Sequence, residues 1–109
     1  MDIADWRKKI DEIDRKLVTL INERAHAAQE IGRIKRVRNL PVYEAERERV
    51  ILQKICDMNQ GPLSNGDLTH VYERLIEVMR AIQKVEPESD AAPAPNSGKR
   101  SETASKSRR

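Results

Sequence analysis

Apolar and polar residues follow a helical period through the first part of the chain. The apolar positions step alternately by three and four residues, and Arg24 takes one place in the series: Ile3, Trp6, Ile10, Ile13, Leu17, Leu20, Arg24, Ala27, Ile31 and Ile34. This spacing predicts an amphipathic helix from about Ile3 to Arg38 with a heptad seam on one face. Such a helix is roughly 50 Å long, whereas a globule of about 85 residues has a radius of gyration of about 12 Å. Much of the seam therefore needs a second chain, and we predict a homodimer.

Two breaks divide the rest of the chain. RNLP at 38–41 and NQGPLSNG at 59–66 contain Pro, Gly and Asn, which disfavour continued helix. We expect a second helix from about Tyr43 to Met58 and a third from about Asn65 to Val85, with Ser64 or Asn65 as N-cap. Phe is absent and no segment alternates like a strand. The predicted fold class is all-α, with one long N-terminal helix and two shorter ones.

The composition changes after Val85. The segment EPESDAAPAPNSGKRSETASKSRR is rich in Pro, Ala, Ser and charge and has no large apolar residue, so it cannot offset its ordering entropy by burial. We predict a domain at 1–85 and a disordered tail at 86–109. The KR and RR pairs of the tail could contact phosphates, but a solubilising extension is the preferred interpretation.

Charge and cysteine usage exclude several classes. Lys and Arg number 21 against 18 acidic residues, and this small mixed excess is weak support for binding to a polyanion. One cysteine, Cys56, and two distant histidines, His26 and His70, provide neither a disulfide framework nor zinc-ligand spacing. No apolar run approaches the roughly 20 residues of a membrane span, and the N-terminus lacks a signal-peptide pattern. We expect a soluble cytoplasmic protein.

A charge in the seam is the first sign of a site. Arg24 stands where Leu or Ile is expected, and a buried unpaired guanidinium would cost several kcal/mol. Lys35, eleven residues later, lies only about 20° around the helix from Arg24. In the plain interpretation, Arg24 pairs with a carboxylate of another helix and Lys35 extends to water. In the functional one, both face a ligand.

The other two segments favour the functional interpretation. At the start of the second helix, Glu44 and Glu48 lie in line with the apolar face that continues to its C-terminal end. Arg47 flanks this face. On the third helix, Gln83 follows Met79 by one turn. Cations, glutamates and an amide that converge in a helical core indicate a pocket for a small, multiply charged ligand.

Arg7 lies too far away to join the same pocket. It precedes Arg24 by seventeen residues, which is roughly 25 Å along a helix. If Arg7 serves a pocket, that pocket belongs to the partner subunit. The alternative is an ordinary surface cation in the RKK sequence.

These residues, taken in order and at their spacing, resemble the all-helical class of chorismate mutases, which are intertwined dimers. The resemblance covers about residues 5–85. Its matching positions are Arg7, Ile10, Ile13, Asp14, Leu17, Leu20, Ile21, Arg24, Ile31, Gly32, Lys35, Pro41, Val42, Glu44, Arg47, Glu48 and Gln83.

The resemblance implies conversion of chorismate to prephenate, a [3,3]-sigmatropic rearrangement in phenylalanine and tyrosine biosynthesis that needs no metal or cofactor. It implies that Arg24, with Arg7 of the other subunit, holds the two substrate carboxylates, and that Arg47 adds positive potential. Lys35 and Gln83 would donate hydrogen bonds to the ether oxygen of the breaking bond.

The resemblance also gives roles to acidic residues and shows two departures. Glu48 would accept a hydrogen bond from the ring hydroxyl, and Glu44 would line the same end of the pocket. Many relatives carry Asp at the position of Glu44. Some bacterial members carry a small hydroxyl residue where this chain has Met79, so a hydrogen bond to a substrate carboxylate would be missing.

Two other functions stay open at this point. An isochorismate-pyruvate lyase shares the fold and many of the pocket cations. A non-enzymatic helical dimerisation module with a nucleic-acid-binding segment is less favoured, because acidic residues are interspersed among the cations of IGRIKRVRNLPVYEAERE. A purely structural coiled coil would leave Arg24 unexplained.

Overall fold

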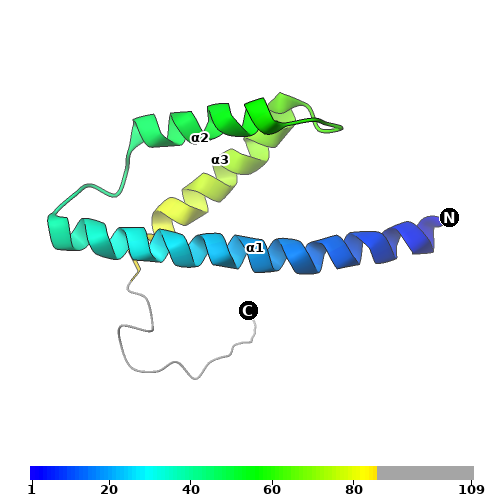
Figure 1. Ribbon diagram of the computed structural model, residues 1–109, viewed down its shortest axis with the longest axis horizontal. Coiled ribbons are helices and arrows are strands. Elements are labelled where there is room, and N and C mark those ends of the chain that lie inside the picture. Colours follow the sequence, from blue (N-terminus) through cyan, green and yellow to red (C-terminus); the bar gives the residue numbers. More distant parts are fainter. Residues whose placement is uncertain (86–109) are drawn as a thin grey trace, which may run out of the picture.

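The computed structural model describes residues 1–85, and within them the chain is entirely helical and loop (Figure 1). The elements are α1 (Ile3–Arg38), α2 (Ala45–Met58) and α3 (Asn65–Ile82). The predicted all-α class and the long first helix are confirmed. The predicted disordered tail at 86–109 lies outside the described residues.

The predicted helix boundaries were wrong at two ends. The second helix begins at Ala45, not Tyr43, because Glu44 is its N-cap and has an extended backbone. The third helix ends at Ile82, not Val85, and Gln83 is its C-cap. These differences matter for the site, because both cap residues are pocket residues.

Local interactions explain where α1 begins and ends. Asp2 and Asp5 form a reciprocal capping box at its N-terminus. At its C-terminus Asn39 adopts the left-handed conformation, with φ 56°, which Asn tolerates better than most residues. The Leu40 N–H then donates to the Lys35 carbonyl at 2.8 Å. The chain turns back here and carries the segment 39–44 from the end of α1 to the start of α2 (Figure 1).

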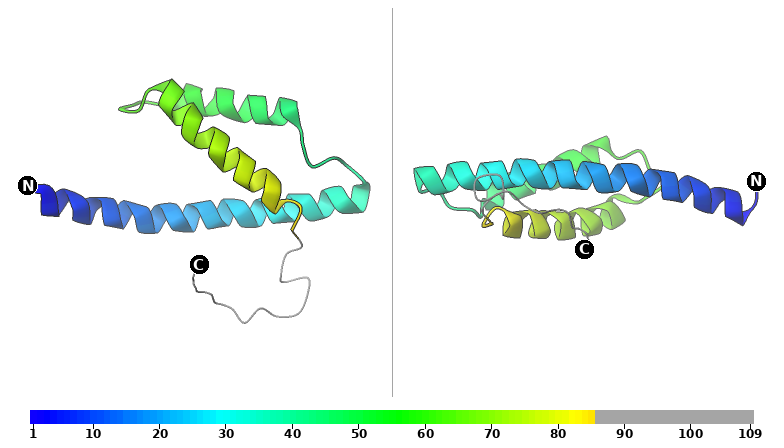
Figure 2. Two further views of the ribbon diagram at one scale, coloured as in Figure 1. Left: turned by 180° about the vertical axis from the view of Figure 1, so that it is seen from behind. Right: turned by 90° about the horizontal axis from the view of Figure 1, so that it is seen from below.

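The C-terminal end of α3 packs closely on α1. α3 runs diagonally from the far end of α2 to α1, and it contacts both helices (Figures 1 and 2). A Cβ at Gly32 would lie 2.0 Å from the backbone oxygen of Gln83, so only glycine allows this approach. The contact places Gln83 beside Lys35, which follows Gly32 by three residues.

The single chain has little core. The molecule measures 52 × 37 × 15 Å, and its short dimension is little more than the roughly 10–12 Å diameter of one helix. Among residues 1–85 the buried apolar side chains are Ala28, Ile55, Ile76 and Met79. The radius of gyration of 16.8 Å exceeds the value of about 12 Å for a globule of this length.

The seam of α1 is uncovered over its N-terminal part. This part extends past the loop between α2 and α3 (Figures 1 and 2). Its seam residues Ile3, Trp6 and Leu20 are 67%, 56% and 60% exposed. Such a contiguous apolar stripe is typical of an interaction surface. No helix within residues 1–85 has the length and apolar character needed to cross a bilayer.

Candidate active site

A pocket of about 290 Å³ lies where α1, α3 and the beginning of α2 meet. It contains every pocket residue predicted from the sequence except Arg7. Its lining consists of Arg24, Ala27, Ala28, Ile31, Lys35, Val42, Glu44, Arg47, Glu48, Ile51, Ile76, Met79, Arg80 and Gln83. Arg7 lies on the exposed N-terminal part of α1, away from this pocket, as the helical rise predicted.

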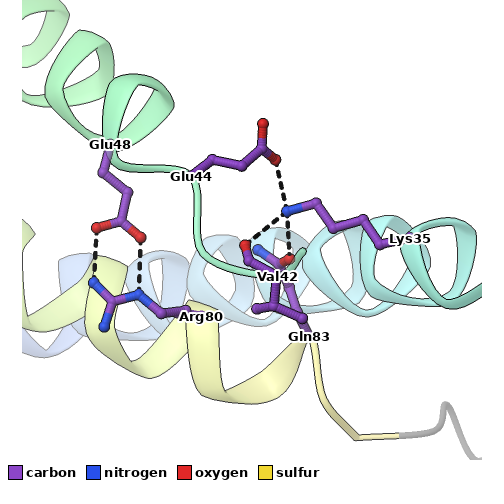
Figure 3. A network of polar contacts seen from close by, with 6 residues as sticks. All are labelled: Lys35, Val42, Glu44, Glu48, Arg80 and Gln83. Carbon is purple, nitrogen blue, oxygen red and sulfur yellow. Dashed lines mark hydrogen bonds and ion pairs between the residues drawn. The ribbon is translucent and has the colours of Figure 1, made fainter. Parts of the chain in front are cut away.

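Lys35 is buried, with 7% exposure, so the interpretation in which it extends to water was wrong. Its ammonium donates to the Val42 carbonyl at 2.8 Å and to Gln83 Oε1 at 3.0 Å. It also forms an ion pair with Glu44 Oε2 at 2.6 Å (Figure 3). The three N–H groups of a lysine therefore have three acceptors, and its buried charge is compensated.

The hydrogen bond from Lys35 fixes the orientation of the Gln83 amide. Since Oε1 accepts from Lys35, the Nε2 group points its donors elsewhere. No acceptor within residues 1–85 takes a hydrogen bond from that Nε2 group, which leaves it available to a ligand in the pocket. The backbone oxygen of Gln83 accepts from Arg36 Nη1 at 2.9 Å, so Arg36 also holds this end of α3.

Glu48 and Arg80 form the second charged pair of the pocket (Figure 3). Arg80 Nε and Nη2 donate to the two Glu48 oxygens at 2.9 and 2.7 Å. These hydrogen bonds lower the pKa of Glu48 below its usual value. Burial opposes the shift, and the positive charges of Arg80 and Lys35 add to it. The Glu48 carboxylate is therefore ionised at neutral pH.

Arg80 is a pocket residue that the sequence analysis missed. It follows Ile76 by four residues and precedes Gln83 by three, so the three lie on one face of α3. That spacing was a usable signal. It would have placed a cation on the buried face of the third helix, as Arg24 is placed in the seam of the first.

Two guanidiniums of the pocket are uncommitted. Arg24 is half-buried and Arg47 is exposed, and neither forms an ion pair or hydrogen bond with any residue from 1 to 85. The plain interpretation, in which Arg24 pairs with a carboxylate of another helix, is therefore not met within residues 1–85. A guanidinium held in such a place is suited to a carboxylate of a ligand.

The charges of the lining do not cancel. Four cationic and two carboxylate side chains surround the pocket, so it carries an excess of two positive charges. The apolar residues Ile31, Ile51 and Met79 complete the wall. No three His, Cys, Asp or Glu side chains within residues 1–85 gather into a possible metal site. The arrangement fits a small organic dianion.

Comparison with known proteins places this geometry in a family. Residues 6–84 match the family model described as "Chorismate mutase type II". The chain is similar to the "Chorismate mutase" of Methanocaldococcus jannaschii, with 36% identity over 85 residues that cover 75% of this chain and 84% of that protein. It is also similar to the "Bifunctional chorismate mutase/prephenate dehydratase" of Aquifex aeolicus, with 38% identity over 87 residues, 76% of this chain.

The relatives differ in length, and the structures agree in fold. The chain spans only 24% of the Aquifex protein and 23% of similar bifunctional proteins from two other bacteria. It superposes on the chorismate mutase of Thermus thermophilus (Form II) with a TM-score of 0.76 and 26% identity. That match covers 78% of this chain and 98% of the solved one.

The Glu48–Arg80 pair makes stability depend on pH. Because the pKa of Glu48 is lowered by folding, its stabilising contribution is present above the ordinary glutamate pKa of about 4.3 and is lost as pH falls through the folded value. We expect Glu48→Gln to be less stable than the wild type at pH 7, with the difference shrinking below about pH 4. Urea unfolding at fixed protein concentration from pH 7 to pH 3 measures this.

The matched control for this experiment is Glu73→Gln, which removes an exposed carboxylate of α3 that has no ion pair within residues 1–85. Its stability difference from the wild type should stay small throughout. A Glu48→Gln difference that is the same at every pH would contradict the assignment of the charged pair.

Proposed function

Because this chain belongs to the chorismate mutase type II family, we propose that its pocket binds chorismate and converts it to prephenate. The observation that carries the proposal is the buried ammonium of Lys35, which is hydrogen-bonded to the Gln83 amide in a pocket that two uncommitted arginines also line. We assign the reaction to phenylalanine and tyrosine biosynthesis, as the resemblance implies, and to the cytoplasm, as the cysteine usage of the sequence suggests.

The chemistry needs positioning and electrostatics. In the rearrangement one C–O bond breaks as one C–C bond forms, and no proton, nucleophile or metal takes part. The protein must hold a flexible dianion in its folded, reactive conformer. It must also place fixed donors where negative charge develops on the ether oxygen. Both tasks need cations and hydrogen-bond donors in a partly dry pocket.

Lys35 and Gln83 are the donors for the ether oxygen in this proposal. The Gln83 Nε2 group is directed away from Lys35 by the hydrogen bond to Oε1. Of the three acceptors of Lys35, Glu44 is the most easily exchanged, because its side chain is 50% exposed. A substrate oxygen that replaces or shares the place of Glu44 would receive a charge-assisted hydrogen bond.

Arg24 and Arg47 are this chain's own uncommitted cations for the substrate: in the proposal Arg24 holds a carboxylate and Arg47 adds positive potential, while Glu48 is the acceptor for the ring hydroxyl. The two arginines have no competing partner within residues 1–85, so binding does not require an ion pair to break. Met79 offers no hydrogen-bond donor and contributes apolar wall. The excess of two positive charges in the lining matches the charge of chorismate.

We further propose that two chains form an intertwined dimer and that Arg7 enters the partner's pocket. The exposed seam of α1 supports the dimer, since a slab 15 Å thick leaves that stripe in water. Burial of apolar surface at roughly 25 cal/mol per Å² gives a strong driving force for pairing. The reach of α1 supports the role of Arg7, which is roughly 25 Å from the pocket of its own chain.

The basic stretch of α1 gives little support to nucleic-acid binding. Arg33 pairs with Glu30, Lys35 is buried, and Arg36 donates to the Gln83 backbone. These contacts divide the cations between different faces and partners. The cations therefore do not form the exposed, uniform patch that a polyanion site requires.

The direct test is conversion of chorismate by the purified protein without added metal or cofactor. We expect loss of chorismate well above the uncatalysed rate, with prephenate as the product by chromatography. Salicylate and pyruvate from isochorismate would instead indicate the related lyase. An inert wild-type protein that is folded and dimeric would overturn the proposal.

Lys35→Met should lower kcat by about 100-fold to 1,000-fold, as loss of one transition-state donor does elsewhere. The variant keeps an apolar stem of similar length, so the dimer should remain folded by circular dichroism. Lys54→Met, at an exposed position of α2, is the matched control and should retain wild-type activity. Near-normal turnover in Lys35→Met would remove Lys35 from the mechanism.

A shared pocket predicts complementation between inactive chains. An Arg7→Ala chain keeps Arg24, and an Arg24→Ala chain keeps Arg7, so a heterodimer contains one intact pocket. After complete random exchange, activity should reach about a quarter of the wild-type value, because half of the dimers are mixed and each has one good site of two. Absence of rescue, with exchange shown by mass spectrometry of tagged chains, would exclude the shared pocket.

A further inference from the structure

We propose that Arg80 is a positioning residue for Glu48: it holds this carboxylate at the pocket wall, in the orientation in which Glu48 accepts the substrate hydroxyl. The inference rests on the proposed function and extends it to a residue outside the matching positions of the family resemblance. It assigns Arg80 no contact with the reacting atoms.

The geometry fixes Arg80 from two sides. Its guanidinium binds both oxygens of Glu48, at 2.9 and 2.7 Å. Its carbon Cζ also lies 4.8 Å from the centroid of the Tyr43 ring, within the range of a cation–π contact. Bidentate pairing defines the plane of the carboxylate as well as its position. Glu48 is therefore held in one orientation.

The stem of Arg80 comes from a rigid part of the fold. Ile76, one turn earlier, and Met79, the preceding residue, are 6% and 3% exposed. The side chain reaches from this packed face of α3 to the first turn of α2 (Figure 3). Arg80 thus connects two helices across the pocket wall, at a point where Glu48 has no other ion pair within residues 1–85.

Pairing with Arg80 does not use up the acceptor capacity of Glu48. A carboxylate has about four lone-pair sites, and Arg80 occupies one on each oxygen. A hydroxyl can therefore be accepted while the pair is intact. Without Arg80, the cations left in the pocket lining would be Arg24, Lys35 and Arg47. A Glu48 side chain drawn to them would neutralise the groups proposed to bind the substrate.

The charges that face Glu48 come from every element around it. α1 contributes Arg24 and Lys35, α2 and the segment before it contribute Glu44 and Arg47, and α3 contributes Arg80. Hydrogen bonds from Arg80 are the largest cause of the lowered pKa of Glu48. Removal of Arg80 should therefore raise the pH at which Glu48 loses its charge, while the other cations remain.

A double-mutant cycle tests whether Arg80 acts through Glu48. We expect Arg80→Met to lower kcat/KM for chorismate by roughly tenfold or more in the wild-type background, because a displaced positioning group has effects of this size. In the Glu48→Gln background it should have little further effect, since coupled residues are strongly non-additive. Equal losses in both backgrounds would mean that Arg80 binds the substrate itself and would overturn the proposal.

The pH profile is the second measurement. The acid limb of kcat/KM should move to higher pH in Arg80→Met. In Arg80→Lys the shift should be smaller, because the positive charge remains although the bidentate fork is lost. Arg49→Met is the matched control, because it removes an exposed Arg–Glu pair on the outer face of α2. It should change neither activity nor profile.

The remaining outcomes are also decisive. An Arg80→Met protein that behaves like Arg49→Met would overturn the positioning role while leaving the mutase proposal intact, whereas an inactive wild type would overturn the mutase proposal itself. If Arg80→Met does not fold by circular dichroism, Arg80→Lys replaces it in the cycle. The expected result is of the same kind: a loss of kcat/KM in the wild-type background and little further loss in the Glu48→Gln background.

Discussion

The buried ammonium of Lys35 is the interaction on which the rest of the pocket depends. A lysine that is 7% exposed is stable as a cation only with acceptors around it. Those acceptors come from three places: the carbonyl of Val42, the side chain of Glu44 and the amide of Gln83. To satisfy one charge, the loop after α1 and the end of α3 must both be brought against α1, and their meeting defines the pocket.

The close contact at Gly32 makes this arrangement possible. The backbone of Gln83 lies where any other residue would place its Cβ, so α3 approaches α1 more closely there than side chains normally permit. The cap positions of the other helices have a similar double use. Glu44 ends the extended segment before α2, and Gln83 ends α3. Helix termini have side chains and backbone groups that are not committed to the helix, and this pocket is built from them.

The charged groups divide into paired and uncommitted ones. Lys35 is paired with Glu44, and Arg80 with Glu48, whereas Arg24 and Arg47 have no ion pair within residues 1–85. Paired groups are held in place before a ligand arrives, so their orientation costs little on binding. The uncommitted arginines supply the attraction for an anion. α1 contributes both to this pocket and, through its exposed seam, to the dimer that we propose.

The sequence by itself determined the helices and the faces of α1. Its period predicted α1 from Ile3 to Arg38 as the structure has it, placed Arg24 and Lys35 on one side, and located both breaks, because helical periodicity is a local property of the chain. Pairings between elements were decided only by the tertiary structure. The pairing of Arg80 with Glu48 was missed, because a residue's angle on its own helix does not say which group faces it from another. The start of α2 was misplaced because Glu44, its N-cap, has an extended backbone. The hydrogen bond of Lys35 to Gln83 depends on the crossing of α3 over α1, which the close contact at Gly32 allows. The hydrogen bonds of Arg80 to Glu48 depend on the packing of α3 against α2.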